Sequence, residues 1–372
     1  MTQRLLAVAL AAIVIATPVT AQQPDRPTFT VGSAVASRGT LAKGVLAVPA
    51  GSDSALDIQV AVIHGVRPGS VVAFIAGTHA TEYATEIAMQ RLILRIDPLK
   101  LAGTVIIVPV VNIPSFTSMT PVRNPVDNKT MVGGYPGDSA GTQSQRAMWL
   151  LVQQVVAQSD VVVDFHGGDL DEDVGAPFTA AVRGGRARPD SESLRLAQAF
   201  RYGHILIQNR DAASPRVGST LAGQAMMRGE TVLLAAIGRS GVVAPADLAN
   251  VINGCLNMLG ALKMIVHPLP AAPYHPLYLD GNGPRIAATG PGVWFPVARA
   301  NTMVKQGDVL GRTTDFLGTE TGKVLSPIDG LLVYIHGVPS MRRGVVLAEV
   351  LAVLPAVPEW VQPAGRGGRG GQ

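Results

Sequence analysis

Apolar and polar positions follow two periods along the first two thirds of the chain. Short apolar runs bounded by turn-forming residues predict strands, and longer stretches with apolar residues three or four apart predict helices. The strands are expected over residues 58–63, 71–75, 105–111, 161–165, 205–207 and 231–237, and the helices over 82–95, 144–157, 190–200, 220–227 and 245–266. This alternation of strand and helix predicts an α/β sheet.

The pattern changes after residue 268. A proline-rich stretch over 268–284 reads as a linker, and beyond it short apolar runs are separated by glycine. Such runs are typical of a small β-barrel or sandwich, expected here over 285–355. The remaining segments are a leader with edge strands over 22–45, a long irregular loop over 112–142 and a flexible tail over 356–372.

Composition narrows the class of protein and the kinds of site. The chain has 372 residues, 47% hydrophobic and 15% charged, which is enough for a full core and more than one domain. The net charge of +4 is spread along the chain, so nucleic acid is not expected as a partner. The single cysteine, Cys255, excludes an intrachain disulfide and a cysteine-rich zinc site. A metal in this chain must therefore be bound by histidine and carboxylate.

The first 21 residues read as a secretory signal. A basic start over 1–4 precedes an apolar run over 5–17, and small residues lead to a cleavage site after Ala21. The apolar run is shorter than the about 20 residues of a membrane span, although an uncleaved anchor is the alternative. We expect a periplasmic or secreted protein with no membrane span after cleavage.

Two stretches carry candidate metal ligands. His79 and Glu82 lie three residues apart where the strand over 71–75 gives way to a helix, so both side chains project from the same turn. His166 ends the strand over 161–165, and Asp164 lies two residues before it on the same face, where it can orient a metal-binding histidine. Each feature also occurs without a metal, at a solvated helix start or a strand end.

Together these stretches resemble the succinylglutamate desuccinylase/aspartoacylase family, a branch of the zinc carboxypeptidase superfamily. The resemblance rests on His79-x-x-Glu82, an arginine in the following loop, Tyr135-Pro136-Gly137 and the segment 164–168, DFHGG. It implies a zinc hydrolase-like catalytic domain over 46–267, followed by the small all-β domain. The expected fold is a mixed, mostly parallel sheet with helices on both faces.

The resemblance also implies roles for particular residues. His79, Glu82 and His166 would ligate one Zn²⁺ ion with the fourth position open to water, whose pKa zinc lowers to about 7. Arg123 would polarise the scissile carbonyl and stabilise the oxyanion, and a solvated loop arginine is the alternative. The acyl group of the substrate and the oligomeric state stay open.

Two departures from the family pattern concern the substrate and the general base. Val132 and Gly133 stand where the family has the Asn-Arg pair that grips a substrate carboxylate, so acetylaspartate and succinylglutamate are not expected substrates. Ala236 stands where the family has its general-base glutamate. Either another carboxylate replaces it, or the substrate needs no base, or the protein binds without turnover. The nearest acidic residues follow the DFHGG segment, and Glu172 is our candidate base; the others are Asp169, Asp171 and Asp173.

The sequence therefore predicts a zinc-dependent hydrolase that cleaves an amide or ester bond of a small acyl or peptide substrate. Two alternatives stay open: a zinc-containing binding protein descended from such an enzyme, suggested by Ala236, and a periplasmic metallopeptidase.

Overall fold

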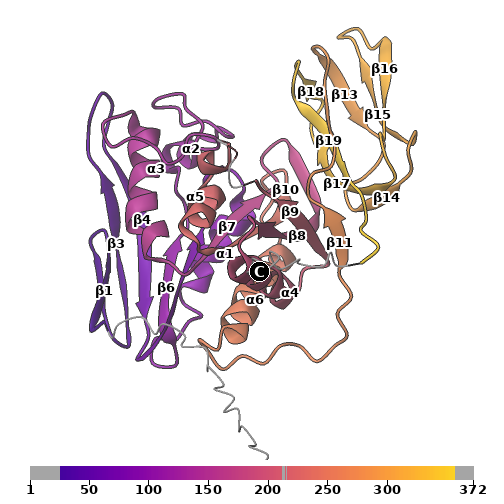
Figure 1. Ribbon diagram of the computed structural model, residues 1–372. Coiled ribbons are helices and arrows are strands. Elements are labelled where there is room, and N and C mark those ends of the chain that lie inside the picture. Colours follow the sequence, from indigo (N-terminus) through magenta and orange to yellow (C-terminus); the bar gives the residue numbers. More distant parts are fainter. Residues whose placement is uncertain (1–25, 212–213, 215, 357–372) are drawn as a thin grey trace, which may run out of the picture.

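One large mixed sheet runs through the molecule and carries helices on both faces (Figure 1). The computed structural model describes residues 26–356 except 212–213 and 215. The expected secretory signal and nearly all of the expected tail therefore lie outside the described residues. The expected α/β fold is confirmed, as is the additional all-β region at the C-terminal end.

The centre of the sheet is parallel. Strands β6, β5, β7 and β10 lie side by side in that order and run in the same direction, so the carboxyl ends of β5, β7 and β10 meet at one edge. Antiparallel strands β4 and β3 extend the sheet beyond β6, and β8, β9 and β11 extend it beyond β10. The bounds are β3 (Thr40–Val48), β4 (Leu56–His64), β5 (Arg67–Ile75), β6 (Ala102–Val108), β7 (Val161–Gly167), β8 (Glu172–Arg183), β9 (His204–Asn209), β10 (Thr231–Arg239) and β11 (Leu277–Asp280).

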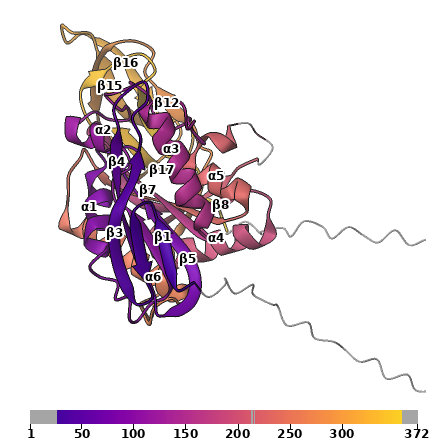
Figure 2. The same ribbon diagram turned by 90° about the vertical axis from the view of Figure 1, so that its left-hand side faces the viewer.

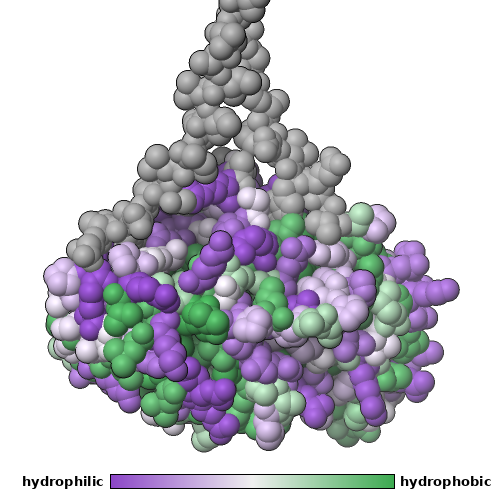
Figure 3. Space-filling view, turned by 90° about the horizontal axis from the view of Figure 1, so that it is seen from below, coloured by the Kyte–Doolittle hydropathy of each residue, from purple (hydrophilic) through white to green (hydrophobic). Residues whose placement is uncertain are grey.

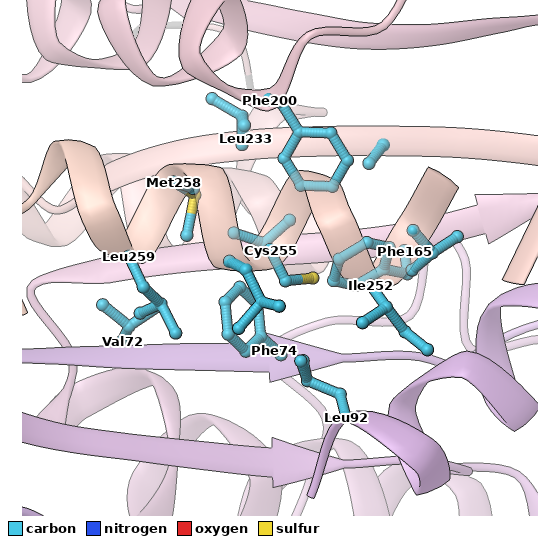
Figure 4. Close-up of a cluster of buried hydrophobic side chains, with 14 of the residues drawn as sticks. Val72, Phe74, Leu92, Phe165, Phe200, Leu233, Ile252, Cys255, Met258 and Leu259 are labelled. Carbon is cyan, nitrogen blue, oxygen red and sulfur yellow. The ribbon is translucent and has the colours of Figure 1, made fainter. Parts of the chain in front are cut away.

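Side chains on the two faces of the sheet are covered by different helices. On one face Phe74 and Phe165 pack at a ring distance of 6.0 Å, and Phe165 packs against Phe200 of α4 at 6.2 Å (Figure 4). Cys255 of α6 is buried in the same cluster. Figure 2 shows α1 and α3 on opposite sides of the strands. The helices are α1 (Tyr83–Leu92), α4 (Ala187–Phe200) and α6 (Pro245–Ala261) on the first face, and α3 (Gln143–Gln154) and α5 (Leu221–Arg228) on the second.

The C-terminal strands form a second β region that is joined to the large sheet. Strand β17 pairs with the start of β8 through Ile335 opposite Asp173 and His336 opposite Glu172. The β region therefore stands beside the edge where the parallel strands end (Figure 1). Its strands are β12 (Arg285–Ala287), β13 (Gly292–Pro296), β14 (Thr302–Val304), β15 (Val309–Thr314), β16 (Glu320–Leu325), β17 (Gly330–His336), β18 (Ser340–Met341) and β19 (Val346–Leu351).

Three stretches differ from the sequence expectation. The acidic run after the DFHGG segment leads into a strand that the sequence pattern does not predict, β8, which begins at Glu172 and contains Gly175 and Pro177. The expected linker contains β11, which pairs with β9 and so belongs to the large sheet. The loop over 112–142 contains the short helix α2 (Ile113–Ser118), capped by the side chain of Asn112.

The remaining described elements are peripheral. Strands β1 (Thr28–Val31) and β2 (Ala34–Ser37) form a hairpin within the expected leader. Within the described residues, no helix combines the length and apolar character needed to span a membrane. In the view from below, hydrophilic and hydrophobic side chains are interspersed over the visible part of the surface (Figure 3).

Candidate functional site

The turn between β5 and α1 places His79 and Glu82 together. Gly77 has a φ of +74°, and a Cβ atom there would lie 2.7 Å from the Cα atom of Val110. The close approach of these two backbone segments therefore requires glycine. After this turn the Nδ1 atom of His79 lies 3.0 Å from the Oε1 atom of Glu82, which directly precedes α1. The predicted pairing of these two side chains is observed.

Strand β7 brings the second histidine to the same place. Asp164 of β7 lies opposite Ile75 of β5, so the two strand ends are neighbours. The Nδ1 atom of His166 lies 3.3 Å from the Oε2 atom of Glu82, and its Nε2 atom lies 3.5 Å from the Oδ2 atom of Asp164. Asp164 therefore faces the ring nitrogen that points away from Glu82, as required of a residue that orients a ligand histidine.

The donor atoms of His79, Glu82 and His166 fit a single metal ion. One ligand atom from each lies within 4.8 Å of the others. The Nε2 atom of His79 is buried and has no hydrogen-bond partner among the described residues. Buried polar atoms of this kind are normally satisfied. Two imidazoles and one carboxylate are the donor set of a catalytic zinc site with one open position.

The protonation states of Glu82 and His166 depend on the charges of their neighbours. Burial alone disfavours the Glu82 carboxylate, but the adjacent imidazoles of His166 and His79 lower its pKa to about 2. Burial likewise opposes protonation of His166, yet Asp164 and Glu82 raise its pKa well above the usual value. Glu82 is thus held as an anion, ready to bind a cation.

These side chains open into a cavity of about 370 Å³ built from both parts of the molecule. The sheet edge contributes the three candidate ligands and Ala236. The C-terminal β region contributes Tyr334 and an ion pair in which the Nε atom of Arg285 lies 3.0 Å from the Oε2 atom of Glu349. The other walls are largely apolar, and include Val174, Phe178, Leu206, Leu221, Leu234, Val333 and Val346.

Glu172 lies in the same cavity as the metal-ligand candidates. Burial, together with the charges of Glu82 and Asp169, raises the pKa of Glu172 to about 7. The Tyr334 hydroxyl donates a long hydrogen bond that is shared between the Oε1 atom of Glu172 at 3.5 Å and the carbonyl oxygen of Val346 at 3.3 Å. The Asp169 amide lies 3.4 Å from the Oε2 atom of Glu172. A carboxyl group with such a pKa beside a metal site can act as a general base near neutral pH.

Of the three positions that depart from the family pattern, two line the cavity and one does not. Ala236 lines the cavity and pairs with His166 across the two parallel strands, so a longer side chain there would reach the metal cluster. Val132 also lines the cavity, and it is 40% exposed. Gly133 is not among the lining residues and has a φ of +84° with open space beside it.

The structure does not bring Arg123 to the cavity. Its side chain is exposed, and its Nη1 atom donates a hydrogen bond of 2.7 Å to the carbonyl oxygen of Asn128 in its own loop. Among the described residues that line the cavity, the arginines are Arg210 and Arg285.

Arg210 was missed at the sequence level. It directly follows β9, and its Nη1 atom donates a 2.9 Å hydrogen bond to the Oγ1 atom of Thr220, which also lines the cavity. No motif surrounds it, and the pairing of β9 with β8 that carries it to the cavity joins distant parts of the sequence. Only the isolated arginine at the end of a short predicted strand could have drawn attention to it.

Comparisons with known proteins identify similar sequences and similar folds. The chain is 25% identical over 323 residues to the N-alpha-acetyl-L-2,4-diaminobutyric acid deacetylase of Halomonas elongata, covering 84% of this chain and 92% of that protein. Among solved structures, a succinylglutamate desuccinylase/aspartoacylase from Rhodobacter sphaeroides matches with a TM-score of 0.75 and 24% identity, over 85% of this chain and 96% of that one. The product-bound ectoine utilization protein EutE (DoeB) from Ruegeria pomeroyi matches with a TM-score of 0.77 and 20% identity, over the same shares.

A family model decides the relationship. The model of the succinylglutamate desuccinylase/aspartoacylase catalytic domain matches residues 68–262. This range is more than half of the chain and includes His79, Glu82 and His166. The expected family is therefore confirmed, and the chain belongs to the succinylglutamate desuccinylase/aspartoacylase family.

Proposed function

We propose that this chain is a zinc-dependent deacylase that hydrolyses the amide bond of a small N-acylated amine, with Glu172 as its general base. The observation that carries the proposal is the presence of Glu172 in the same cavity as His79, Glu82 and His166, although the family position of the base is occupied by Ala236. Cleavage of an ester bond by the same groups is compatible with this geometry.

The metal would be held by His79, Glu82 and His166, with Asp164 fixing the orientation of the His166 ring. A bound zinc ion supplies a Lewis acid that polarises the scissile carbonyl and makes water a stronger nucleophile. Asp164 also keeps negative charge next to the ligand set, which favours binding of a cation.

Glu172 would move the protons of the reaction. It accepts a proton from the attacking water as the oxygen bonds to the carbonyl carbon. It then donates this proton to the leaving nitrogen as the carbon–nitrogen bond breaks, which yields a carboxylic acid and an amine. The Tyr334 hydroxyl lies 3.5 Å from one oxygen of Glu172 and the amide of Asp169 lies 3.4 Å from the other, so each carboxyl oxygen has a donor beside it.

The size of the cavity favours a small substrate. A volume of about 370 Å³ lies at the lower end of the range for small-molecule sites, so we favour a deacylase over the peptidase alternative. The relationship to a deacetylase of an acetylated amino acid supports the same class of substrate. The binding-protein alternative is favoured by one observation, the alanine at position 236. We also propose, from the sequence of the first 21 residues, that the enzyme acts in the periplasm or outside the cell.

The decisive experiment moves the carboxylate between two positions. Glu172→Gln is expected to lower kcat on N-acetyl amino acids by about 10²–10⁴, because a positioned general base is lost. Adding Ala236→Glu to this variant is expected to restore a large part of the activity, since the new carboxylate lies beside His166.

The outcomes separate the candidates. Full activity in Glu172→Gln would show that another group is the base. The binding protein would be favoured by two results together. The wild type would bind zinc stoichiometrically but hydrolyse none of a panel of N-acyl amines and esters, and the Ala236→Glu variant would hydrolyse at least one of them.

A further inference from the structure

The end of the molecule opposite the metal cluster gathers basic side chains from several segments. Strand β5 begins at Arg67 on this side and runs to the turn that carries His79, and β6 begins beside it at Ala102. We call this end the basal face, and Figure 3 shows the molecule from this side. Its segments are 26–27, 38–39, 64–69, 91–104 and 263–266, and their basic residues are Arg26, Arg38, Arg67, Arg91, Arg95, Lys100 and Lys263.

Hydrogen bonds join these segments into one surface. The Nη2 atom of Arg67 donates to the carbonyl oxygen of Lys100 at 3.2 Å. The amide of Ala102 donates to the carbonyl oxygen of Met264 at 2.7 Å, which holds the chain after α6 against the start of β6. One small cavity of this face is lined by Arg26, Arg38 and Arg67. Cations that are scattered along the sequence are therefore neighbours in the fold.

Acidic side chains are scarce on the basal face. In its segments the acidic residue is Asp97, whose Oδ2 atom lies 3.5 Å from the Nζ atom of Lys100. The Lys100 side chain is 81% exposed, so this pair is weak and screened by solvent. Asp160, which precedes β7 beside this face, accepts a hydrogen bond from the amide of Val71. The excess of positive charge favours contact with an anionic surface.

Large apolar side chains are exposed between these cations. Leu94 and Leu99 are 77% and 67% exposed, and Val266 is 95% exposed. A Cβ atom at Gly39 would lie 2.9 Å from the Cγ1 atom of Val66 and 3.2 Å from the Cδ2 atom of Leu99, so these two side chains lie close together. Basic residues around exposed leucine and valine suit the headgroup region of an anionic bilayer, which takes up both charge and apolar area.

The first described residues leave the fold at the basal face. The Nε2 atom of His64 lies 2.9 Å from the carbonyl oxygen of Arg26, and the amide of Arg38 donates to the carbonyl oxygen of Pro27. The expected secretory signal has its apolar run over 5–17, and residues 18–25 span at most about 28 Å even when fully extended. This short connection would bring the basal face to the bilayer during export, and would keep it there if the apolar run stayed as an anchor.

We propose that the basal face binds the surface of an anionic phospholipid bilayer. Its basic residues contact the headgroups, and Leu94, Leu99 and Val266 enter the layer below them. This contact is independent of the reaction proposed for the cavity. Because the metal cluster lies at the other end of β5, the cavity stays directed away from the bilayer.

The competing surface is the tip of the hairpin between β15 and β16. Phe316 and Leu317 are 78% and 93% exposed there. Asp315 precedes them and Glu320 follows them, so negative charge flanks this tip and opposes contact with anionic lipid. The hairpin belongs to the C-terminal β region, away from the basal face, and so provides matched control variants.

Vesicle binding by the wild type is the first test. The secreted form, from residue 22 onward, is mixed with phosphatidylcholine vesicles or with vesicles in which one quarter of the lipid is phosphatidylglycerol. Binding is expected to be at least about 10-fold tighter to the anionic vesicles. It is expected to disappear between about 0.1 M and 1 M salt, where the screening length falls from about 10 Å to about 3 Å. Equal binding to both kinds of vesicle, or none to either at the lower salt, would overturn the proposal.

Charge reversal locates the binding surface. Arg95→Glu combined with Lys100→Glu is expected to weaken binding to the anionic vesicles by about 20-fold or more, because each basic residue near the surface contributes about 5-fold. Arg312→Glu combined with Lys323→Glu makes the same change of charge in the C-terminal β region and is expected to weaken binding by less than about 3-fold. Thermal unfolding of each variant checks that the fold is kept. Equal losses in the two double variants would contradict the proposed location.

A fluorescent label tests the apolar part of the contact without removing a charge. Cys255 is fully buried, so a single introduced cysteine can be labelled selectively with an environment-sensitive dye. Anionic vesicles are expected to shift the emission of labelled Leu99→Cys to shorter wavelength and to leave labelled Leu317→Cys unchanged. Leu94→Ser combined with Leu99→Ser is expected to weaken binding by about 10-fold, and Phe316→Ser combined with Leu317→Ser is the control. A shift only at position 317, or at neither position, would overturn the proposal.

Discussion

The wall of the cavity formed by the ends of β5 and β7 takes its functional side chains from two short stretches of sequence. A second wall takes them from the start of β8, the end of β9 and the C-terminal β region. Its contact between Glu172 and Tyr334 joins residues 162 positions apart. The functional residues of the first wall therefore lie in local sequence motifs, whereas those of the second wall are brought together only by pairing of strands that are distant in the sequence. This difference separates the part of the site proposed to bind the metal from the part proposed to contact the substrate and accept the proton.

The largest effect is expected from breaking the first wall. His166→Ala is expected to abolish stoichiometric zinc binding and to reduce activity by about 10³-fold or more, because the Lewis acid contributes several kcal/mol to the reaction. Elemental analysis of the purified protein measures the first effect and hydrolysis of N-acetyl amino acids the second. The control is His275→Ala, since His275 is exposed and lies outside the cavity. Zinc retained at one equivalent in His166→Ala would place the metal elsewhere.

The next effect concerns the base on the second wall and its dependence on pH. Glu172 must be ionised to accept a proton, and its pKa is raised to about 7, so activity is expected to fall as the pH drops below this region. A bound cation lowers the pKa of a nearby carboxyl, which moves this acidic limb to somewhat lower pH.

Glu172→Gln removes the titrating group, so its residual activity is expected to lack that limb. The neighbouring Asp171→Asn variant should keep it, because Asp171 does not line the cavity. An unchanged pH profile in Glu172→Gln would show that another group titrates.

The contrast between the walls also explains what the sequence predicted. His79, Glu82, His166 and Asp164 were predicted because each pair lies within one turn or one strand end, and spacing alone determines which side chains share a face. Position 172 was singled out only as part of an acidic run. Its place in the cavity depends on β8, which the sequence pattern did not reveal.

Arginines illustrate the same limit. A cation was expected at position 123, but its exposed side chain bonds to the carbonyl oxygen of Asn128 in its own loop. The cavity instead receives Arg210 through the pairing of β9 with β8, and Arg285 from the C-terminal β region. Neither residue belongs to a local pattern. The fold class was predictable because helix and strand periodicities are local properties of the sequence. The positions of Arg210 and Arg285 in the cavity depend on long-range strand pairing, so they were not predictable in this way.

A third prediction concerns the stability of the first wall. Glu86 of α1 is fully buried, and neither of its carboxyl oxygens has a hydrogen-bond partner among the described residues. Burial, with the nearby charges of Glu82 and Asp169, raises the pKa of Glu86 to about 9. The folded protein therefore holds this group protonated at neutral pH.

Because the folded-state pKa lies above the unfolded value, the stability associated with Glu86 is complete below about pH 4.5 and is lost as the pH rises towards 9. Glu86→Gln does not titrate, so it is expected to gain stability relative to wild type across this window, by about 1–3 kcal/mol at pH 8. Urea unfolding at pH 5 and pH 8 measures the difference. Glu320→Gln, at an exposed position, is the control, and a Glu86→Gln difference that is the same at both pH values would contradict the prediction.

The smallest effect is expected from the link between the two parts of the molecule. Tyr334→Phe removes the hydroxyl that donates to Glu172 and leaves the ring in place. Since that hydrogen bond favours the ionised carboxyl, its loss is expected to lower kcat by less than about 10-fold and to move the acidic limb upward by less than about one pH unit. Tyr278→Phe is the control, because the Tyr278 hydroxyl bonds to Gln198, away from the cavity. A lower kcat without any shift of the limb would mean that Tyr334 acts on the substrate directly, and that the C-terminal β region contributes to binding rather than to the state of the base.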